Sequence, residues 1–167
     1  RAAGLKRVVV TTLQAVSGAG RPGVDELEGQ VAAIARGEKP RAETFPVPIA
    51  YNVIPLCESF RDDGYSTEEM KLLLETRKIL GMDDLDVSMT CVRVPVPVGH
   101  SATILVETER PLSPEAAREA LAAFPGVRVV DDPSRNLFPT PAGVAGCDDV
   151  LVGRVRRELG SDRLWLW

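Results

Sequence analysis

Apolar and β-branched residues recur along this chain in runs whose period predicts β-strands. Every second residue from 92 to 98 is valine, the period of a strand that buries one face. Short runs rich in β-branched residues also indicate strands. Five strands are predicted in this way: Lys6–Leu13, Asp86–Val98, Ala102–Glu109, Val127–Val130 and Asp148–Leu159.

Three segments instead show helical spacing with start and stop signals. The first runs from about Pro22 to Arg36, with Gly37 after its end. The second begins at Ser66 and ends near Leu80, and the third follows Ser113. Strands joined by long connections, together with three helices, predict a single α+β domain over residues 1–167. Its sheet is expected to be mixed and mostly antiparallel, with the helices on one face.

The second helix carries a capping box and two further charged residues. Ser66 at the N-cap places Glu69 at N3, so Glu69 is expected to hold the helix start, and a glutamine is expected to serve there as well. Glu68 and Lys71 fall on a charged stripe, for which a solvated face with weak ion pairs is the simplest interpretation. The predicted core stripe is apolar: Met70, Leu73, Leu74 and Leu80. Residues Ala50–Leu56 are also mostly apolar and are predicted to be buried.

Composition excludes several classes of protein. The 167 residues are 44% hydrophobic and 26% charged, as in ordinary globular proteins, and the net charge of −4 favours neither nucleic acid nor an anionic membrane as partner. The three cysteines are far apart and suggest neither a disulfide framework nor a metal site, so a cytoplasmic setting is expected. The start without Met and the apolar end at Leu164–Trp167 suggest a piece of a longer chain.

Candidate chemistry gathers around the single histidine. Arg93 precedes His100 by seven residues, an odd offset that would place the two side chains on opposite faces of a straight strand. Pro95, Pro97 and Gly99 lie between them and predict an interruption that lets both reach one site. A lone histidine and a strand arginine are more often structural, so these residues alone leave the choice open.

A glycine-rich turn follows the first predicted strand. Gln14 sits at the end of that strand, and Ser17-Gly18-Ala19-Gly20 leads into the first helix. Such a turn exposes backbone N–H groups to an anion, but its spacing matches neither common phosphate-binding motif. A tight turn that requires positive φ is the simpler interpretation.

Several motifs together resemble the C-terminal domain of aspartate-β-semialdehyde dehydrogenases. They occur in the order of that family and span most of the chain. The matching segments are Thr11–Gly20, Tyr51–Pro55, Glu68–Lys71, Glu75–Leu80, Cys91–Ser101 and Val152–Arg156. The resemblance implies the fold of the glyceraldehyde-3-phosphate dehydrogenase-like C-terminal domain.

The resemblance also implies a reaction and roles for single residues. The family reduces L-aspartyl 4-phosphate to L-aspartate 4-semialdehyde with NADPH, through a cysteine thioacyl intermediate, in the biosynthesis of lysine, diaminopimelate, threonine, methionine and isoleucine. His100 matches the acid/base histidine, and Gln14 a catalytic, substrate-positioning glutamine. The implied substrate-binding residues are Arg93 for the α-carboxylate, Glu68 for the ammonium and Lys71 for the phosphate. Ser17 and Gly18 match a turn that contacts NADP.

Some features of the family are not in this sequence. The Asn-Cys segment of the nucleophile, the N-terminal NADP-binding domain and the final helix are expected to lie outside the chain, which alone should form a homodimer without turnover. Two alternatives stay open: the equivalent domain of an N-acetyl-glutamyl-phosphate reductase, whose substrate lacks a free ammonium, and a non-catalytic homologue kept for assembly.

Overall fold

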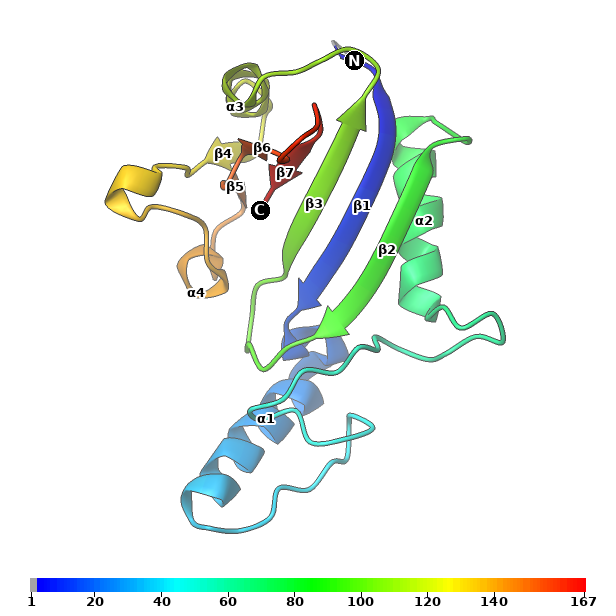
Figure 1. Cartoon of the computed structure of the whole chain (residues 1–167). Coiled ribbons are helices and arrows are strands. Elements are labelled where there is room, and N and C mark those ends of the chain that lie inside the picture. The colour runs from blue at the N-terminus through cyan, green and yellow to red at the C-terminus, as the bar shows by residue number, and fades with distance from the viewer. Residues whose placement is uncertain (1–2) are drawn as a thin grey trace.

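A five-stranded mixed sheet forms the centre of the computed structural model, which describes residues 3–167 (Figure 1). The expected domain also includes residues 1–2, which lie outside the described part. The strand order is β2-β1-β3-β7-β6, with β1 Leu5–Gln14, β2 Asp86–Arg93, β3 Ser101–Thr108, β6 Arg156–Arg157 and β7 Leu164–Leu166. Strands β1 and β2 are parallel, and the other neighbours are antiparallel. The predicted α+β class with a mixed, mostly antiparallel sheet is confirmed.

The helices differ in how they meet this sheet. They are α1 Gly20–Ala35, α2 Thr67–Leu80, α3 Pro114–Ala122 and α4 Pro141–Val144, with the 3₁₀ turns η1 Val16–Ala19 and η2 Pro133–Arg135. Helix α2 lies behind β2, whereas α1 extends beyond the end of β1 (Figure 1). Buried apolar side chains from η1, from α1 and from the segment after α1 form one cluster: Val16, Leu27, Ile49, Ala50 and Ile54.

Residue pairing shows that α2 and α3 pack on the same face of the sheet. Gln14 faces α2, because its side chain bonds to Glu68. Val8, six residues earlier on β1, points to the same side and pairs with Val106. Val106 in turn pairs with Leu164, which packs against α3. The opposite face of β1, β2 and β3 has no helix in front of it (Figure 1).

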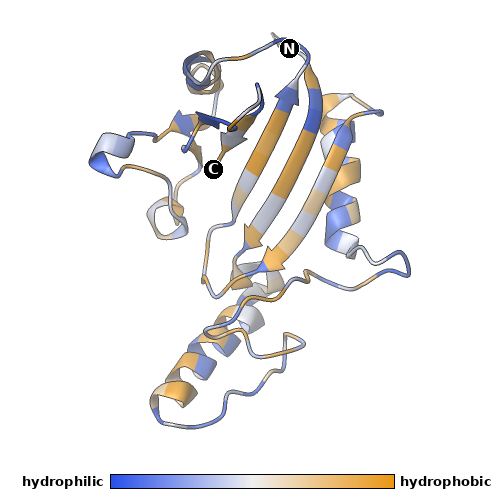
Figure 2. Cartoon of the chain, in the orientation of Figure 1, coloured by the Kyte–Doolittle hydropathy of each residue, from blue (hydrophilic) through white to orange (hydrophobic). Residues whose placement is uncertain are grey.

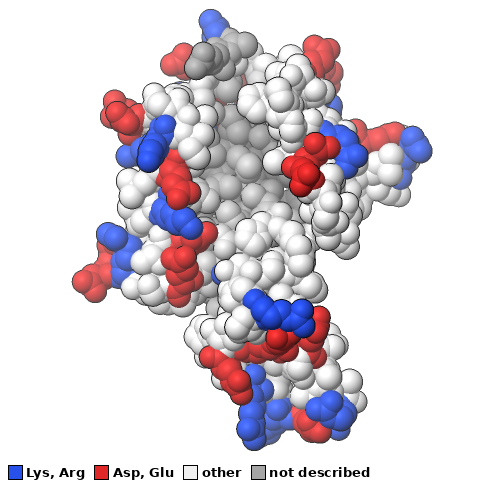
Figure 3. Space-filling view, turned by 180° about the vertical axis from the view of Figure 1, so that it is seen from behind, with Lys and Arg blue, Asp and Glu red and all other residues white. Residues whose placement is uncertain are grey.

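Hydrophobic residues are concentrated in the centre of the sheet. The middle parts of β1 and β3 are hydrophobic, whereas the N-terminal part of β1 and the C-terminal end of β3 include hydrophilic residues (Figure 2). Charged side chains gather at the end of the molecule formed by α1 and the loop after it (Figure 3). Within residues 3–167, no helix is long and apolar enough to cross a membrane, and no group of His, Cys, Asp and Glu side chains could hold a metal ion.

Two of the predicted strands are shorter than expected. The strand predicted over Asp86–Val98 ends at Arg93, because Pro95 and Pro97 cannot donate to a strand ladder. The strand predicted over Asp148–Leu159 is broken into β5 Val150–Val152 and β6. β5 pairs in parallel with β4 Val127–Val129 in a separate small sheet.

A buried aspartate explains the second break. Arg154 has a positive φ of 54°, and its N–H donates to Asp131 Oδ1 at 2.8 Å. The N–H of Val155 donates to Asp131 Oδ2 at 3.0 Å. These bonds redirect the chain from the small sheet to the large one, so alternation along Asp148–Leu159 does not mean one continuous strand.

Two predicted apolar surfaces are only partly buried. Leu74 and Leu80 of the expected core stripe of α2 are 60% and 48% exposed, whereas Leu72, Leu73, Thr76 and Arg77 are half-buried, so the inward face of the helix is rotated from the expected stripe. In Ala50–Leu56, Tyr51 and Val53 are 78% and 56% exposed while Ala50 and Ile54 are buried. The backbone turns at Tyr51, where φ is 58°, so only part of that segment faces the core.

Candidate functional site

The polar residues singled out by sequence meet where β1 and β2 end and α2 begins. Gln14 and Arg93 are direct neighbours, because they pair in the parallel register of the two strands. The Nε2 of Gln14 donates to Glu68 Oε1 at 3.2 Å. Lys71 Nζ lies 3.4 Å from Glu68 Oε2. Three elements therefore bring an amide, a carboxylate and two cations together.

Arg93 is the buried cation of this site, with only 6% of its surface exposed. Its backbone exchanges two hydrogen bonds with Ile54, at 2.8 and 3.0 Å. Its Nη1 donates to the carbonyl of Ala15 at 2.6 Å, and the guanidinium lies 5.9 Å from the ring centre of Phe45. These contacts fix one edge of the guanidinium, and Nε and Nη2 form the other edge, which suits a carboxylate.

His100 reaches the same place from the loop after β2. The N–H of Ala15 donates to His100 Nδ1 at 3.1 Å, so the backbone of Ala15 contacts both His100 and Arg93. With Nδ1 as acceptor, the proton of the neutral ring sits on Nε2. Partial burial lowers the pKa of His100, and the Arg93 charge lowers it further, while Glu68 acts in the opposite sense. The neutral, Nε2-donating ring is therefore the favoured form near pH 7.

Gly18 lies against both of these side chains. A Cβ at this position would be 2.6 Å from Arg93 Nη1 and 3.5 Å from His100 Cε1. Only glycine leaves this room without moving the guanidinium. The positive φ expected of the turn occurs at Gly20, where φ is 74°, so Gly18 is glycine for space rather than for backbone conformation.

The amides of the turn are already used within the protein. Ser17 N–H donates to Pro97 O at 3.1 Å, and Gly18 N–H donates to Ala15 O at 3.2 Å. An anion cradle of these two N–H groups is therefore not formed. A cofactor can meet this turn through the Ser17 hydroxyl and the exposed surface of Gly18.

Lys71 projects from the first turns of α2 at the solvent side. Glu68, and more weakly Glu75, raise the pKa of Lys71, which stays charged near neutral pH. An exposed ammonium paired with one carboxylate can exchange that partner for a phosphate at little cost.

Two of the three cysteines are small, fully buried side chains. Cys57 and Cys91 are 1% and 0% exposed. Burial raises the pKa of Cys57 to about 11 and also raises that of Cys91. Cys147 is half-buried and lies near Arg128, at 3.6 Å from Nη2 to Sγ. The buried pair are thiols rather than thiolates at neutral pH, so neither is a ready nucleophile.

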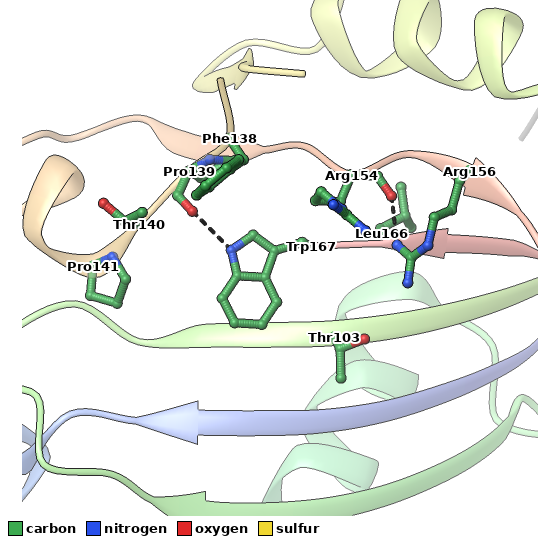
Figure 4. A pocket seen from close by; sticks show the side chains of 9 residues that line it. All are labelled: Thr103, Phe138, Pro139, Thr140, Pro141, Arg154, Arg156, Leu166 and Trp167. Atoms are coloured by element: carbon green, nitrogen blue, oxygen red, sulfur yellow. Dashed lines mark hydrogen bonds between the residues drawn. The ribbon is translucent and has the colours of Figure 1, made fainter. Parts of the chain in front are cut away.

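Two of the cavities beside the sheet are bordered by Leu166 and Trp167. The larger, of about 670 Å³, includes Gln14 and His100 in its wall, with Thr12, Ala102 and Ile104 from the strands. A smaller one of about 380 Å³ lies beside β3 and β7 and is separate from the five polar residues (Figure 4). There Trp167 donates from Nε1 to Pro139 O at 3.0 Å, and Arg154 and Arg156 lie at one end. Of these two cavities, the larger one is lined by residues of the candidate site.

Comparison with known proteins gives one family. The model of the semialdehyde dehydrogenase dimerisation domain matches residues 1–167. An aspartate-semialdehyde dehydrogenase of Aquifex aeolicus is 50% identical over 93% of the chain and 46% of its own length. The corresponding protein of Bacillus subtilis is 45% identical over 100% of the chain and 51% of its own length. The chain thus spans about half the length of the curated relatives it matches.

Solved structures of the same family superpose on this chain. A crystal structure of aspartate semialdehyde dehydrogenase II from Vibrio cholerae, complexed with ASA, superposes with a TM-score of 0.93 at 41% identity. That alignment covers 99% of this chain and 49% of the other. An aspartate semialdehyde dehydrogenase with NADP from Candida albicans superposes with a TM-score of 0.61 at 25% identity, over 97% and 44% of the two chains.

Proposed function

The chain belongs to the aspartate-semialdehyde dehydrogenases, of which it is the C-terminal dimerisation domain, and we propose that it supplies substrate recognition and proton transfer to the full enzyme. The proposed reaction is reduction of L-aspartyl 4-phosphate to L-aspartate 4-semialdehyde with NADPH. It would take place in the cytoplasm, in the biosynthesis of lysine, diaminopimelate, threonine, methionine and isoleucine. The observation that carries the proposal is the meeting of Gln14, Glu68, Lys71, Arg93 and His100 at one end of the sheet.

The charges of this cluster complement those of the substrate. The free edge of Arg93 suits the planar α-carboxylate, which can accept two parallel hydrogen bonds. Glu68 carries a negative charge and suits the α-ammonium, while the positively charged Lys71 beside it suits the phosphate. An aspartyl phosphate carries these three groups on a short skeleton, so one molecule can satisfy all three side chains.

His100 and Gln14 are proposed to act on the reacting carbonyl. The neutral His100 ring donates from Nε2, and it can take a proton at Nδ1 only after releasing the N–H of Ala15. Gln14 can orient the acyl group with its amide. The cysteine nucleophile is proposed to come from the other half of the enzyme, because Cys57 and Cys91 are buried with raised pKa values.

NADP is proposed to meet this domain only at Ser17 and Gly18. The contact would be peripheral, because the backbone N–H groups of both residues already donate to carbonyl groups of the protein. When bound, the cofactor supplies the hydride. NADP is present in the related structure from Candida albicans, which supports its proposal for this enzyme.

Dimerisation is proposed to use the uncovered face of the sheet. That face presents half-buried apolar side chains from three strands: Val9, Leu13, Val92 and Trp165. A second copy packed there would give a self-complementary, apolar contact.

The substitution Glu68→Gln separates the proposed reaction from that of an N-acetyl-glutamyl-phosphate reductase. In the full-length enzyme it should lower kcat/KM for aspartate semialdehyde by about tenfold or more, because it removes the charge that faces the ammonium. Steady-state kinetics measure the effect. Glu75→Gln, the same change further along α2, is the matched control and should keep wild-type kinetics. Wild-type kinetics in Glu68→Gln would refute the assigned role and favour a substrate without an ammonium.

A further inference from the structure

Glu69 is a buried carboxylate whose two oxygens are bonded to two different segments. Its Oε2 accepts the N–H of Ser66 at 2.7 Å, which completes the capping box of α2. Its Oε1 accepts the N–H of Cys91, in strand β2, at 2.9 Å. The residue is only 9% exposed. One side chain thus joins the first turn of α2 to the sheet.

Both ends of this link adjoin the groups proposed to bind substrate. On the helix, Glu68 directly precedes Glu69 and Lys71 follows two residues later. On the strand, Cys91 lies two residues before Arg93 and points to the same face. The link therefore sets the distance from Glu68 and Lys71, on the helix, to Arg93, on the strand.

We infer that Glu69 is a positioning residue that holds α2 in register with β2 so that Glu68, Lys71 and Arg93 can bind one substrate molecule. This role rests on the proposed function, because it presumes that those three residues bind the substrate. Glu69 itself touches no substrate, since both of its oxygens are used by the backbone.

The link also changes what a glutamine would do at this position. A capping box alone accepts either residue at N3. Here both partners are N–H donors, and a glutamine has one acceptor oxygen and one NH₂ group. It would satisfy either Ser66 or Cys91 and set its own N–H groups against the other. The expectation from sequence that glutamine serves as well as glutamate is therefore revised.

The test is Glu69→Gln in the full-length enzyme, with kinetics in the semialdehyde-oxidising direction. We expect kcat/KM for aspartate semialdehyde to fall about tenfold, with higher KM for the semialdehyde and for phosphate and an unchanged KM for NADP. Ser113→Ala is the matched control, because it removes the cap of α3, where Ser113 Oγ accepts the N–H of Ala116 at 3.1 Å. That variant should lower the melting temperature but leave all three KM values unchanged.

Two results would overturn the inference. One is kcat/KM of Glu69→Gln within twofold of wild type, and the other is an equal change in all three KM values. If Glu69→Gln does not fold, Glu69→Asp decides, because its shorter carboxylate cannot reach both N–H groups and should raise the same two KM values to a smaller extent. An impaired Glu68→Gln beside an unimpaired Glu69→Gln would refute only the positioning role, whereas an unimpaired Glu68→Gln would refute the proposed function.

Discussion

At the scale of single residues, Ala15 joins the two side chains on which the site depends. Its N–H bonds to His100 and its carbonyl to Arg93, and Gly18 leaves the space in which the two meet. Sequence could nominate His100 and Arg93 from their residue types and spacing. It could not nominate Ala15, because a backbone contact leaves no mark on the identity of an alanine.

The state of His100 leads to a prediction about pH. Burial and Arg93 lower its pKa, and protonation at Nδ1 would also break the bond from Ala15. The neutral ring should therefore persist to below pH 6.5, the usual value for histidine. In the full-length enzyme, kcat/KM should stay constant as the pH falls to that value and decline only below it. A decline that begins well above pH 7 would contradict this assignment.

The variant His100→Asn provides the control for that profile. It should lower kcat by about 10²–10⁴, as expected for loss of a general acid/base, and the remaining activity should lose the acidic decline. An acidic decline that survives in the variant would belong to another group.

At the scale of elements, the start of α2 and the interruption between Arg93 and His100 were predicted from sequence, although the strand itself was expected to run on to Val98. Ser66 and Glu69 formed a capping box in the sequence and form one in the structure. The prolines after Arg93 predicted an interruption, and the strand ends there. Both signals are local, since a cap and a proline act within a few residues.

Other elements depended on distant contacts and were predicted less well. The break between β5 and β6 depends on Asp131, which lies more than twenty residues earlier and binds the N–H groups of Arg154 and Val155. The hydrogen bond that the N–H of Cys91 donates to Glu69 likewise joins residues 22 positions apart. Periodicity within a segment carries no information about such partners.

At the scale of the whole molecule, the sheet has one covered and one open face. The open face leads to a prediction about assembly. The variant Thr11→Arg places a charge near the middle of this face, on β1, and should convert the full-length enzyme from dimer to monomer, because a buried unpaired charge is costly. Multi-angle light scattering measures the mass. Thr44→Arg, the same change in an exposed loop, should remain a dimer. A dimer in both variants would place the interface elsewhere.

Recognition of the aspartyl substrate by this domain through Arg93 is tested most directly by Arg93→Lys in the full-length enzyme. Lysine keeps the charge but lacks the planar fork, so the bidentate contact with the α-carboxylate is lost. Steady-state kinetics should show KM for aspartate semialdehyde raised about ten- to hundredfold, with the KM for NADP unchanged. An unchanged KM for the semialdehyde would contradict the account.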